Sequence, residues 1–355
     1  MITLSPQEFY RESLSGAIID VRSPVEFNAG HIPGSTNIPL FSDEERATVG
    51  TLYAESGRDI AIEKGLEFVG PKMADFVRRT KAVLAKQPGD CESEKIAYVH
   101  CWRGGMRSQS FAWLLDMAGI KVRVLKGGYK GFRKVAHRKI GLRHKMVILS
   151  GLTGAGKTEF LIELQKKGEQ IIDLEGLANH RGSSFGAIGL GQQPTTEQFE
   201  NCLFAALEKL NPNRRIWIED EGSRLGHVVV PPRFVKQVRR APAVFLDVPK
   251  ERRLDNLMRE YGDLDRDGLI VATRGIEKRL GGQNMIEAIK AIESGDLRTA
   301  ADISLSYYDR SYLKAFSNLP RETSLNLATV GLEDSEVVAE LIATDVGEAV
   351  TSATE

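Results

Sequence analysis

Cysteine is scarce in this chain, and long apolar runs are missing from it. Only three cysteines occur among 355 residues, at positions 91, 101 and 202. So few and scattered thiols exclude a disulfide framework and a paired-cysteine metal site, and they favour a reducing, cytoplasmic location. No stretch approaches the roughly 18 consecutive apolar residues of a membrane span, and the first residues lack the segments of a secretory signal. We therefore expect no membrane association.

The chain also lacks net charge, because 48 basic residues balance 48 acidic ones. Such a sum argues at first against a nucleic-acid partner, since proteins that bind polyanions usually carry a basic excess. The distribution is more informative. Residues 126–145 hold eight Lys or Arg, two His and no acid, whereas residues 333–355 hold seven acids and no Lys or Arg. The zero is a cancellation, and the basic segment suits a polyanionic partner.

The length and the pattern of elements predict two α/β domains with parallel sheets. A chain of 355 residues suggests two domains, and strands alternate with helices in both halves. Strands are predicted at 17–21, 95–100, 146–150, 170–173, 215–219 and 243–248, and helices at 5–12, 71–86, 108–117, 157–167, 196–209, 250–260 and 284–294. The expected divisions are a domain at 1–135, a basic linker at 136–145, a domain at 146–345 and a disordered tail at 346–355.

Cys101 begins a glycine-bearing loop, HCWRGGMRS at 100–108, directly after a predicted buried strand. The helix expected after the loop would turn its N-terminus and backbone N–H groups toward the sulfur, which stabilises a thiolate or an anion attached to it. Arg103 and Arg107 add positive charge, and two glycines let the backbone turn tightly. We interpret Cys101 as a nucleophile and the two arginines as its catalytic partners.

The other two cysteines have no comparable surroundings. Cys91 lies in a polar loop, and Cys202 lies on an amphipathic helix. A free cysteine is most often a small buried hydrophobe. We therefore interpret both as structural residues.

The first part of the chain resembles the rhodanese family of sulfur-transfer domains, over roughly residues 5–135. The resemblance rests on DVRSPVEF at 20–27, on GHIPGSTNIP at 30–39 and on the cysteine loop. It departs from the family in one respect. Simple sulfurtransferases usually place four residues between the cysteine and the closing arginine, whereas five intervene here. His-Cys-x₅-Arg-Ser is also the signature of cysteine-dependent phosphatases, so phosphatase chemistry stays open on the loop alone.

A second loop, GLTGAGKT at 151–158, fits the pattern G-x₄-G-K-[ST]. It lies between a predicted strand and a predicted helix, which is the context that a phosphate-binding loop requires. Its backbone N–H groups would surround phosphate oxygens, its lysine would reach the terminal phosphates, and its threonine would ligate Mg²⁺. The predicted phosphate-binding residues are Gly151, Gly154, Gly156, Lys157 and Thr158. A P-loop NTPase-like domain is therefore expected in the second half.

A carboxylate at the end of a neighbouring strand would complete such a site. IWIEDEG at 216–222 supplies three consecutive acids, of which Glu219 and Asp220 are the expected metal-side residues. Thr158 and Asp220 would hold Mg²⁺. A solvated acidic turn is the alternative interpretation of the segment.

Residues 173–186 form a polar segment rich in Gly, Asn, His, Arg and Ser after a predicted strand. Open α/β sheets bind ligands at this edge, so we interpret His180 and Arg181 as contacts to an anionic substrate group. A plain connecting loop is the alternative. Three arginines on the predicted helix 250–260 could also reach phosphates or could be solvated: Arg252, Arg253 and Arg259.

Taken together, the motifs resemble those of bacterial tRNA 2-selenouridine synthases, over roughly residues 5–320. The resemblance rests on the segments 101–108, 151–158, 173–186 and 217–226. It implies a transferase that acts on the wobble 2-thiouridine of certain tRNAs. A geranyl group from geranyl diphosphate first alkylates the sulfur, and selenium from selenophosphate then replaces it. We further expect Lys157 and any Mg²⁺ to assist departure of the diphosphate, and the resemblance implies that Cys101 carries selenium as a selenenylsulfide.

An RNA substrate would explain the basic segment 126–145. Its Lys and Arg residues would contact phosphates, and Tyr129 and Phe132 would stack on bases. The predicted substrate-binding residues here are Lys130, Arg133 and Lys134. A solvated linker is the alternative.

We expect no tightly bound cofactor. The expected partners are tRNA and the two small co-substrates, with a selenophosphate-supplying enzyme as a further candidate. The main alternative function is a P-loop kinase fused to a sulfurtransferase or to a cysteine-dependent phosphatase domain, acting on small molecules. A regulatory module without activity is disfavoured, because Cys101, Lys157 and Thr158 are all present.

Overall fold

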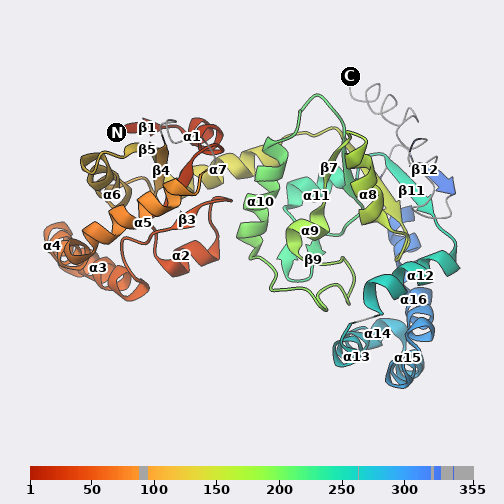
Figure 1. The fold of residues 1–355 in the computed structure, drawn as a ribbon. Coiled ribbons are helices and arrows are strands. Elements are labelled where there is room, and N and C mark those ends of the chain that lie inside the picture. The colour runs from red at the N-terminus through yellow and green to blue at the C-terminus, as the bar shows by residue number, and fades with distance from the viewer. Residues whose placement is uncertain (88–94, 263, 321–323, 329–338, 340–355) are drawn as a thin grey trace. The chain divides into compact units, whose positions relative to one another are not determined.

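The chain folds into two compact units, Met1–Lys139 and Ile140–Glu355 (Figure 1). The structure, a computed structural model, describes residues 1–87, 95–262, 264–320, 324–328 and 339. Each unit contains a five-stranded parallel sheet with helices around it, so the predicted α/β class is confirmed. Cys91 and the predicted tail lie outside the described residues, as does the acidic stretch 333–355 apart from residue 339. Within the described ranges, no helix is long and apolar enough to cross a membrane.

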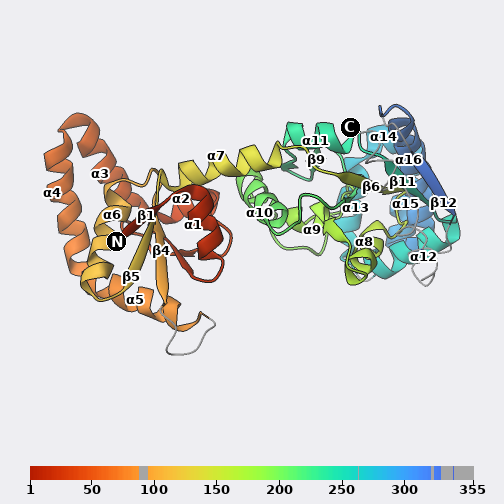
Figure 2. The same ribbon diagram turned by 90° about the horizontal axis from the view of Figure 1, so that it is seen from above.

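The sheet of the N-terminal unit has the strand order β1-β5-β4-β2-β3. Its strands are β1 (Ile2–Leu4), β2 (Ala17–Asp20), β3 (Thr36–Asn37), β4 (Ile96–His100) and β5 (Lys121–Leu125). Its helices are α1 (Pro6–Ser13), α2 (Pro24–Ala29), α3 (Asp43–Glu55), α4 (Arg58–Val69), η1 (Gly70–Lys72), α5 (Met73–Ala85), α6 (Met106–Met117) and α7 (Gly128–Ile140). Figure 2 shows helices on both faces of this sheet.

Alternating side chains of β2 and β4 account for the two buried faces. Ile19 and Val99 point to one side, into a cluster that includes Phe76 of α5 and Phe111 of α6. Tyr98 points to the other side, where its ring meets the edge of Phe9 from α1. A strand that is buried on both faces has little polar alternation, which is why the sequence showed continuous apolar runs at these positions.

Several helix starts follow directly from capping residues. Ser5 accepts a hydrogen bond from the Glu8 amide, and the Glu8 carboxylate accepts one from the Ser5 amide, which confirms the predicted start of α1. Ser42 and Glu45 form the same arrangement before α3. No element was predicted at 43–69, although the sequence SDEE at 42–45 carries this capping signal.

The sheet of the C-terminal unit has the strand order β12-β11-β6-β8-β7. Its strands are β6 (Met146–Gly151), β7 (Gln170–Ile172), β8 (Ile216–Glu219), β11 (Ala243–Asp247) and β12 (Ser324–Ala328), and a short hairpin is formed by β9 (Arg224–Leu225) and β10 (Val228–Val229). Its helices are α8 (Lys157–Lys166), α9 (Leu174–Ala178), α10 (Thr196–Glu208), α11 (Pro232–Val238), α12 (Lys250–Tyr261), α13 (Arg266–Gly275), α14 (Glu277–Leu280), α15 (Gly282–Ser294) and α16 (Leu297–Ser317).

The helices α12 to α16 gather beside this sheet as a helical subdomain (Figure 1). Contacts join α13 to α15, α15 to α16, and α16 to α12. Leu269, Ile292 and Ala300 are buried where they meet. The sequence predicted α12 and α15 but not α13, α14 or α16.

Helix α7 crosses the division between the two units, so residues 136–140 of the predicted linker are helical. Tyr129, Phe132, Ala136 and Ile140 are buried, and their spacing places them on one face of the helix. The expectation that Tyr129 and Phe132 stack on RNA bases is therefore wrong, because both rings belong to the core.

Candidate active sites

The cysteine loop follows β4 and leads into α6. Cys101 is 2% exposed, and its Sγ lies 3.2 Å from the Ser108 Oγ. Ser108 Oγ also lies 3.1 Å from the Gly105 carbonyl oxygen, to which it donates. While this single hydroxyl proton is donated to the carbonyl, the Cys101 thiol is the donor between the two atoms; a hydroxyl turned toward the sulfur would stabilise a thiolate. Arg103 is exposed on the same loop.

The start of α7 forms backbone hydrogen bonds with the cysteine loop. The amides of Tyr129 and Lys130 donate to the carbonyls of Cys101 and Trp102, at 2.8 and 2.9 Å. Gly104 and Gly128 adopt positive φ angles, +70° and +59°. A Cβ on Gly104 would come within 2.9 Å of the Gly128 amide nitrogen. Only glycine fits this close approach, and it makes α7 part of the loop's foundation.

Arg107, near the end of the cysteine loop, forms an ion pair with Glu26. Its two terminal nitrogens donate to the Glu26 carboxylate at 2.6 and 3.2 Å. Burial works against the charge, but the hydrogen bonds and charge of Glu26 raise the pKa of Arg107, and the Cys101 sulfur adds to this. Glu26 was missed as a site residue, although it lies in the segment 20–27 on which the rhodanese resemblance rests.

A buried ion pair lies beside the strand that carries Cys101. Arg22 and Asp20 are both fully buried and lie 2.6 Å apart, and the Arg22 guanidinium sits 3.8 Å from the centre of the Tyr129 ring. Burial opposes ionisation of Asp20, but His100 and Arg22 outweigh it and lower its pKa. This pair joins β2 to α7, so part of the DVRSPVEF segment has a structural purpose.

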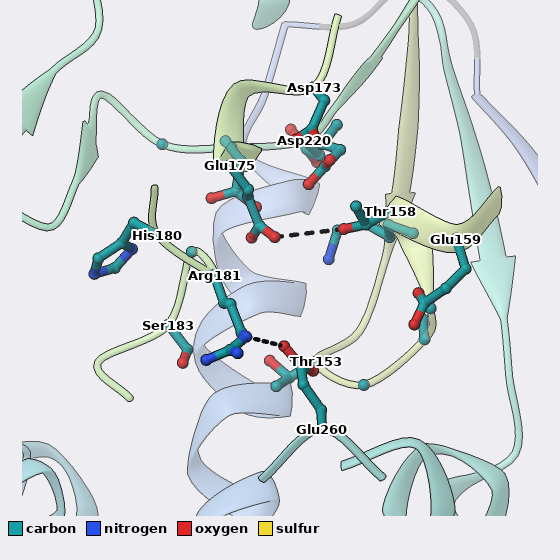
Figure 3. A pocket seen from close by; sticks show the side chains of 18 of the residues that line it. Thr153, Thr158, Glu159, Asp173, Glu175, His180, Arg181, Ser183, Asp220 and Glu260 are labelled. Atoms are coloured by element: carbon teal, nitrogen blue, oxygen red, sulfur yellow. Dashed lines mark hydrogen bonds and ion pairs between the residues drawn. The ribbon is translucent and has the colours of Figure 1, made fainter. Parts of the chain in front are cut away.

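The phosphate loop Gly151–Thr158 connects β6 to α8 at the carboxyl edge of the second sheet. It borders a pocket of about 690 Å³ that is also lined by residues following β7 and β8 (Figure 3). Gly154 has a φ of +80°, and a Cβ on it would lie 2.7 Å from the Arg253 carbonyl oxygen. Four of the five predicted phosphate-binding residues line this pocket: Gly154, Gly156, Lys157 and Thr158. Gly151 is the buried last residue of β6 and is not part of the lining.

Lys157 lines this pocket together with a set of carboxylates. Burial would lower its pKa, but the charges of Glu221, Glu175, Glu219 and Asp220 raise it instead. Lys157 therefore stays protonated, which suits a lysine that contacts phosphate.

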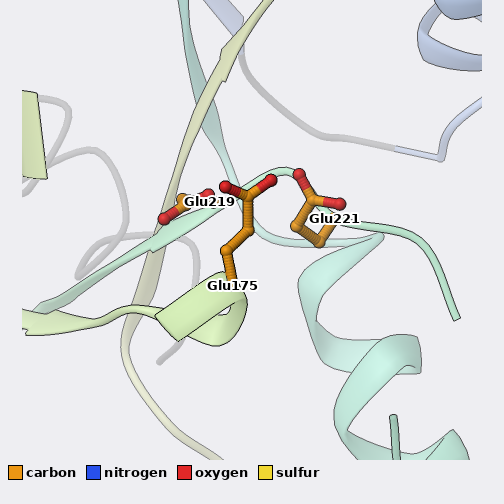
Figure 4. Close-up of side chains that lie close together, drawn as sticks. All are labelled: Glu175, Glu219 and Glu221. Carbon is orange, nitrogen blue, oxygen red and sulfur yellow. The ribbon is translucent and has the colours of Figure 1, made fainter. Parts of the chain in front are cut away.

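Three of these acids form a tight cluster. Ligand atoms of Glu175, Glu219 and Glu221 all lie within 4.8 Å of one another (Figure 4). Glu219 is 0% exposed, and neither of its oxygens has a hydrogen-bond partner among the residues that the structure describes. Burial and the neighbouring acids raise the pKa of Glu219 well above its usual value and that of Glu175 to about 8. Clustered oxygen ligands with an unsatisfied buried carboxylate fit a hard divalent cation such as Mg²⁺.

Thr158 borders the cluster, whereas Asp220 is engaged elsewhere. Thr158 Oγ1 lies 3.4 Å from the Glu175 carboxylate. One oxygen of Asp220 accepts hydrogen bonds from Ser150 and Tyr312, at 2.6 and 2.8 Å. Two of the predicted metal-side residues, Thr158 and Glu219, therefore meet at the cluster, while Asp220 contacts the base of the loop.

Glu175 and Glu221 were not among the predicted site residues. Glu219 and Glu221 are two apart at a strand end, where alternate side chains share a face, and this signal could have favoured Glu221 over Asp220. Glu175 lies in the first turn of α9, after the neighbouring strand β7. Only the strand order, with β7 beside β8, brings it to the other two.

His180 and Arg181 both line the pocket, near Ser183 (Figure 3). Burial, together with His227, lowers the pKa of His180, so this side chain would contact an anion as a neutral hydrogen-bond donor. Arg181 Nε lies 3.0 Å from Glu260, and burial raises the pKa of that carboxyl to about 7.

The arginines of α12 differ in their surroundings. Arg253 is buried, and its guanidinium donates to both Asp309 oxygens at 2.9 and 2.8 Å and to the Thr153 carbonyl at 3.1 Å. It thus braces the phosphate loop through the backbone and does not extend into solvent to reach a phosphate. Arg252 and Arg259 are exposed.

The basic residues of α7 lie at the surface to differing degrees. Lys130 and Lys134 are exposed, whereas Arg133 is half-buried and lies 2.9 Å from His137. Arg138, one turn further along, is exposed. Three cations at i, i+4 and i+8 share one helix face.

Both parts of the chain are similar to known protein families. A rhodanese-like domain profile matches residues 5–135, and the profile of the tRNA 2-selenouridine synthase AAA domain matches residues 144–323. A tRNA 2-selenouridine synthase from Shewanella loihica is 39% identical over 86% of this chain and 88% of its own length. Others from Shewanella woodyi and Bdellovibrio bacteriovorus are 38% and 37% identical, over 78% and 69% of this chain and 79% and 64% of their own lengths.

Proposed function

Since the chain belongs to the tRNA 2-selenouridine synthase family, we propose that it is a transferase that converts the wobble 2-thiouridine of tRNA to 2-selenouridine. The observation that supports two-step chemistry is the presence of two unlike sites in one chain. One offers a thiol beside a hydroxyl and an arginine, and the other offers a phosphate loop at a large pocket.

The first step assigned to the chain is S-geranylation at the phosphate loop. The sulfur of 2-thiouridine attacks C1 of geranyl diphosphate and forms an S–C bond. The C1–O bond breaks, its electron pair leaves with the diphosphate, and the base loses its N3 proton. The protonated Lys157 and the loop amides would stabilise the charge on the departing diphosphate.

Mg²⁺ fits the acid cluster of Glu175, Glu219 and Glu221, with Thr158 beside it. When bound, it would neutralise carboxylate and diphosphate charge. The protein's own contribution is to hold these oxygens together at the edge of the sheet, opposite Lys157.

The second step replaces the alkylated sulfur with selenium. Selenium in selenophosphate is at the oxidation level of selenide, so a selenenylsulfide on Cys101 would require an oxidant. Attack of the Cys101 thiolate on phosphorus requires none. An S–P bond forms, the P–Se bond breaks, and hydroselenide leaves; it then adds to C2 of the base and expels geranylthiolate. Water cleaves the S–P bond and releases phosphate.

The loop supports this assignment through its five-residue spacing and through Ser108 and Arg107. Five residues between Cys101 and Arg107 are typical of loops that surround a phosphoryl group. Ser108 is placed to stabilise the sulfur as a leaving group when water attacks. With doubly labelled selenophosphate, we expect radiophosphorus on Cys101 after rapid quenching; radioselenium on Cys101 would contradict the route.

The direct test of the function is the mass of nucleosides from tRNA incubated with the protein. The tRNA carries 2-thiouridine, and geranyl diphosphate and selenophosphate are supplied together or singly. We expect S-geranyl-2-thiouridine with geranyl diphosphate alone and 2-selenouridine with both. Unmodified tRNA together with rapid ATP consumption in its absence would instead support the kinase alternative.

A further inference from the structure

A small apolar cavity adjoins the phosphate pocket inside the helical subdomain α12–α16. Its volume is about 80 Å³. Five residues line both spaces, which makes the cavity an extension of the phosphate pocket: Thr153, Ser183, Leu257, Tyr261 and Tyr308. Thr153 belongs to the phosphate loop itself.

The part of the cavity wall away from the phosphate pocket is mostly apolar, whereas Thr153, Ser183, Tyr261 and Tyr308 carry hydroxyls where the two spaces meet. This apolar part is formed mainly by Leu269, Ile292, Leu297 and Leu305. The two hydroxyls in this part of the wall are used within their own helices. Thr273 donates to the Leu269 carbonyl at 2.8 Å, and Ser304 donates to the Ala300 carbonyl at 2.9 Å. Apolar cavities of this kind stay dry and bind hydrocarbon.

A polar pocket for phosphate that continues into a hydrocarbon cavity suits a ligand with a phosphate head and an apolar tail. We infer that the cavity binds the end of the prenyl chain whose diphosphate lies on the phosphate loop, and that it limits the length of chain accepted. This inference rests on the proposed function, which supplies a geranyl chain. A cavity of about 150 Å³ lined by Leu, Ile and Phe holds benzene. The smaller space here suits the terminal part of a ten-carbon chain, with the rest in the larger pocket.

The inference also gives the helical subdomain a role. Residues of α13, α15 and α16, which lie outside the sheet, would determine which diphosphate is used. Phe185 lines the cavity next to Tyr261, with the two ring centroids 6.5 Å apart, and belongs to the same segment as His180 and Arg181. Different elements of the same unit would then bind the prenyl chain and the diphosphate.

The test compares binding of inorganic pyrophosphate with geranyl and farnesyl diphosphate to the full-length protein by equilibrium dialysis. Ala301→Leu would fill the cavity from α16, and Leu269→Ala would enlarge it from α13. Ala272→Leu is the matched control, because it adds the same group on α13 outside the cavity lining.

For the wild type we expect geranyl diphosphate to bind at least about tenfold more tightly than pyrophosphate, because burying carbons is favourable. Ala301→Leu should remove most of this advantage without changing pyrophosphate binding, and Leu269→Ala should improve farnesyl diphosphate binding. Ala272→Leu should behave as wild type. An unchanged preference in both cavity variants would overturn the location of the chain, while leaving the function intact. Equal wild-type affinity for pyrophosphate and geranyl diphosphate would overturn the geranyl step, and the inference with it.

Discussion

Glu219 is a carboxyl group in an unfavourable place. It is fully buried, both of its oxygens lack a partner within the described part of the chain, and two further acids lie within reach of it. A charge in such a position is costly unless a cation compensates it. In the metal-free protein the group therefore holds its proton, which is the meaning of its raised pKa.

This protonation makes the stability of the metal-free C-terminal unit depend on pH. The folded state keeps protons on Glu175 and Glu219 that the unfolded chain releases above about pH 4.5. Because the folded state binds more protons, the free energy of unfolding should fall as pH rises from about 5 toward about 8. We expect the urea midpoint in EDTA to be lower at about pH 8 than at about pH 6.

Glu219→Gln should reduce the pH dependence of the urea midpoint, because the glutamine amide does not ionise. Glu293→Gln, an exposed position on α15 outside the pocket, is the control and should leave it unchanged. A urea midpoint that rises over the same pH range would show that the cluster is ionised in the folded protein.

The sequence predicts the position of a site residue in the fold correctly where the signal comes from neighbouring residues. The phosphate loop and Cys101 follow from short motifs next to a strand, because the backbone geometry they need is set by neighbouring residues. Glu175 has no such signal, since it meets Glu219 and Glu221 only through the pairing of β7 with β8. Glu26 likewise meets Arg107 across 81 positions of sequence.

At the scale of elements, the phosphate loop depends on its contact with α12. Gly154 has a positive φ and lies against the Arg253 carbonyl. Gly154→Ala should therefore add about 1–2 kcal/mol of backbone strain and also force the loop and α12 apart. We expect pyrophosphate binding to weaken by about tenfold or more, as measured by calorimetry.

Gly168→Ala is the control variant, because it adds backbone strain without displacing a neighbouring element. Gly168 also has a positive φ, but nothing lies within 4 Å of the position of its added Cβ. The variant should lose stability while keeping its affinity for pyrophosphate. Equal losses of affinity in both variants would show that the contact with α12 is not what shapes the loop.

Helix α7 presents its cations on one face and its rings on the other. If this face contacts RNA, Lys130→Glu with Lys134→Glu should weaken tRNA binding at all sequences and lower the salt dependence of log K by about one per lost phosphate contact. Filter binding over a range of salt concentrations measures both. Lys81→Glu, an exposed position on α5, is the control. An unchanged salt slope in the double variant would remove α7 from the RNA-binding surface.

The sequence led to a wrong role for two residues of α7 and to no prediction of α16, and both outcomes have physical reasons. Tyr129 and Phe132 were assigned to RNA because they lie among cations, yet with Ala136 and Ile140 they form an apolar helical stripe. The stripe was visible in the sequence, and weighing it would have predicted burial. Helix α16 mixes small, polar and aromatic residues along its length, and its place is fixed by packing against α12 and α15.

At the scale of the whole molecule, each unit carries one kind of chemistry. In the proposed function, the N-terminal unit would supply a thiol that accepts a phosphoryl group, and the C-terminal unit would supply a phosphate loop with an apolar extension. A thiocarbonyl sulfur is a poor leaving group until it is alkylated, which gives the two units an order of action. In the proposed function the phosphate loop therefore acts first and Cys101 second.

The measurement that tests this most directly supplies tRNA that already carries S-geranyl-2-thiouridine, together with selenophosphate, to two variants. Lys157→Ala lacks the phosphate-loop cation but keeps Cys101, so it should form 2-selenouridine at nearly the wild-type rate. Cys101→Ala should form none, although it should geranylate 2-thiouridine when given geranyl diphosphate. Failure of Lys157→Ala on the pre-geranylated tRNA, or conversion by Cys101→Ala, would contradict the division of work between the two sites.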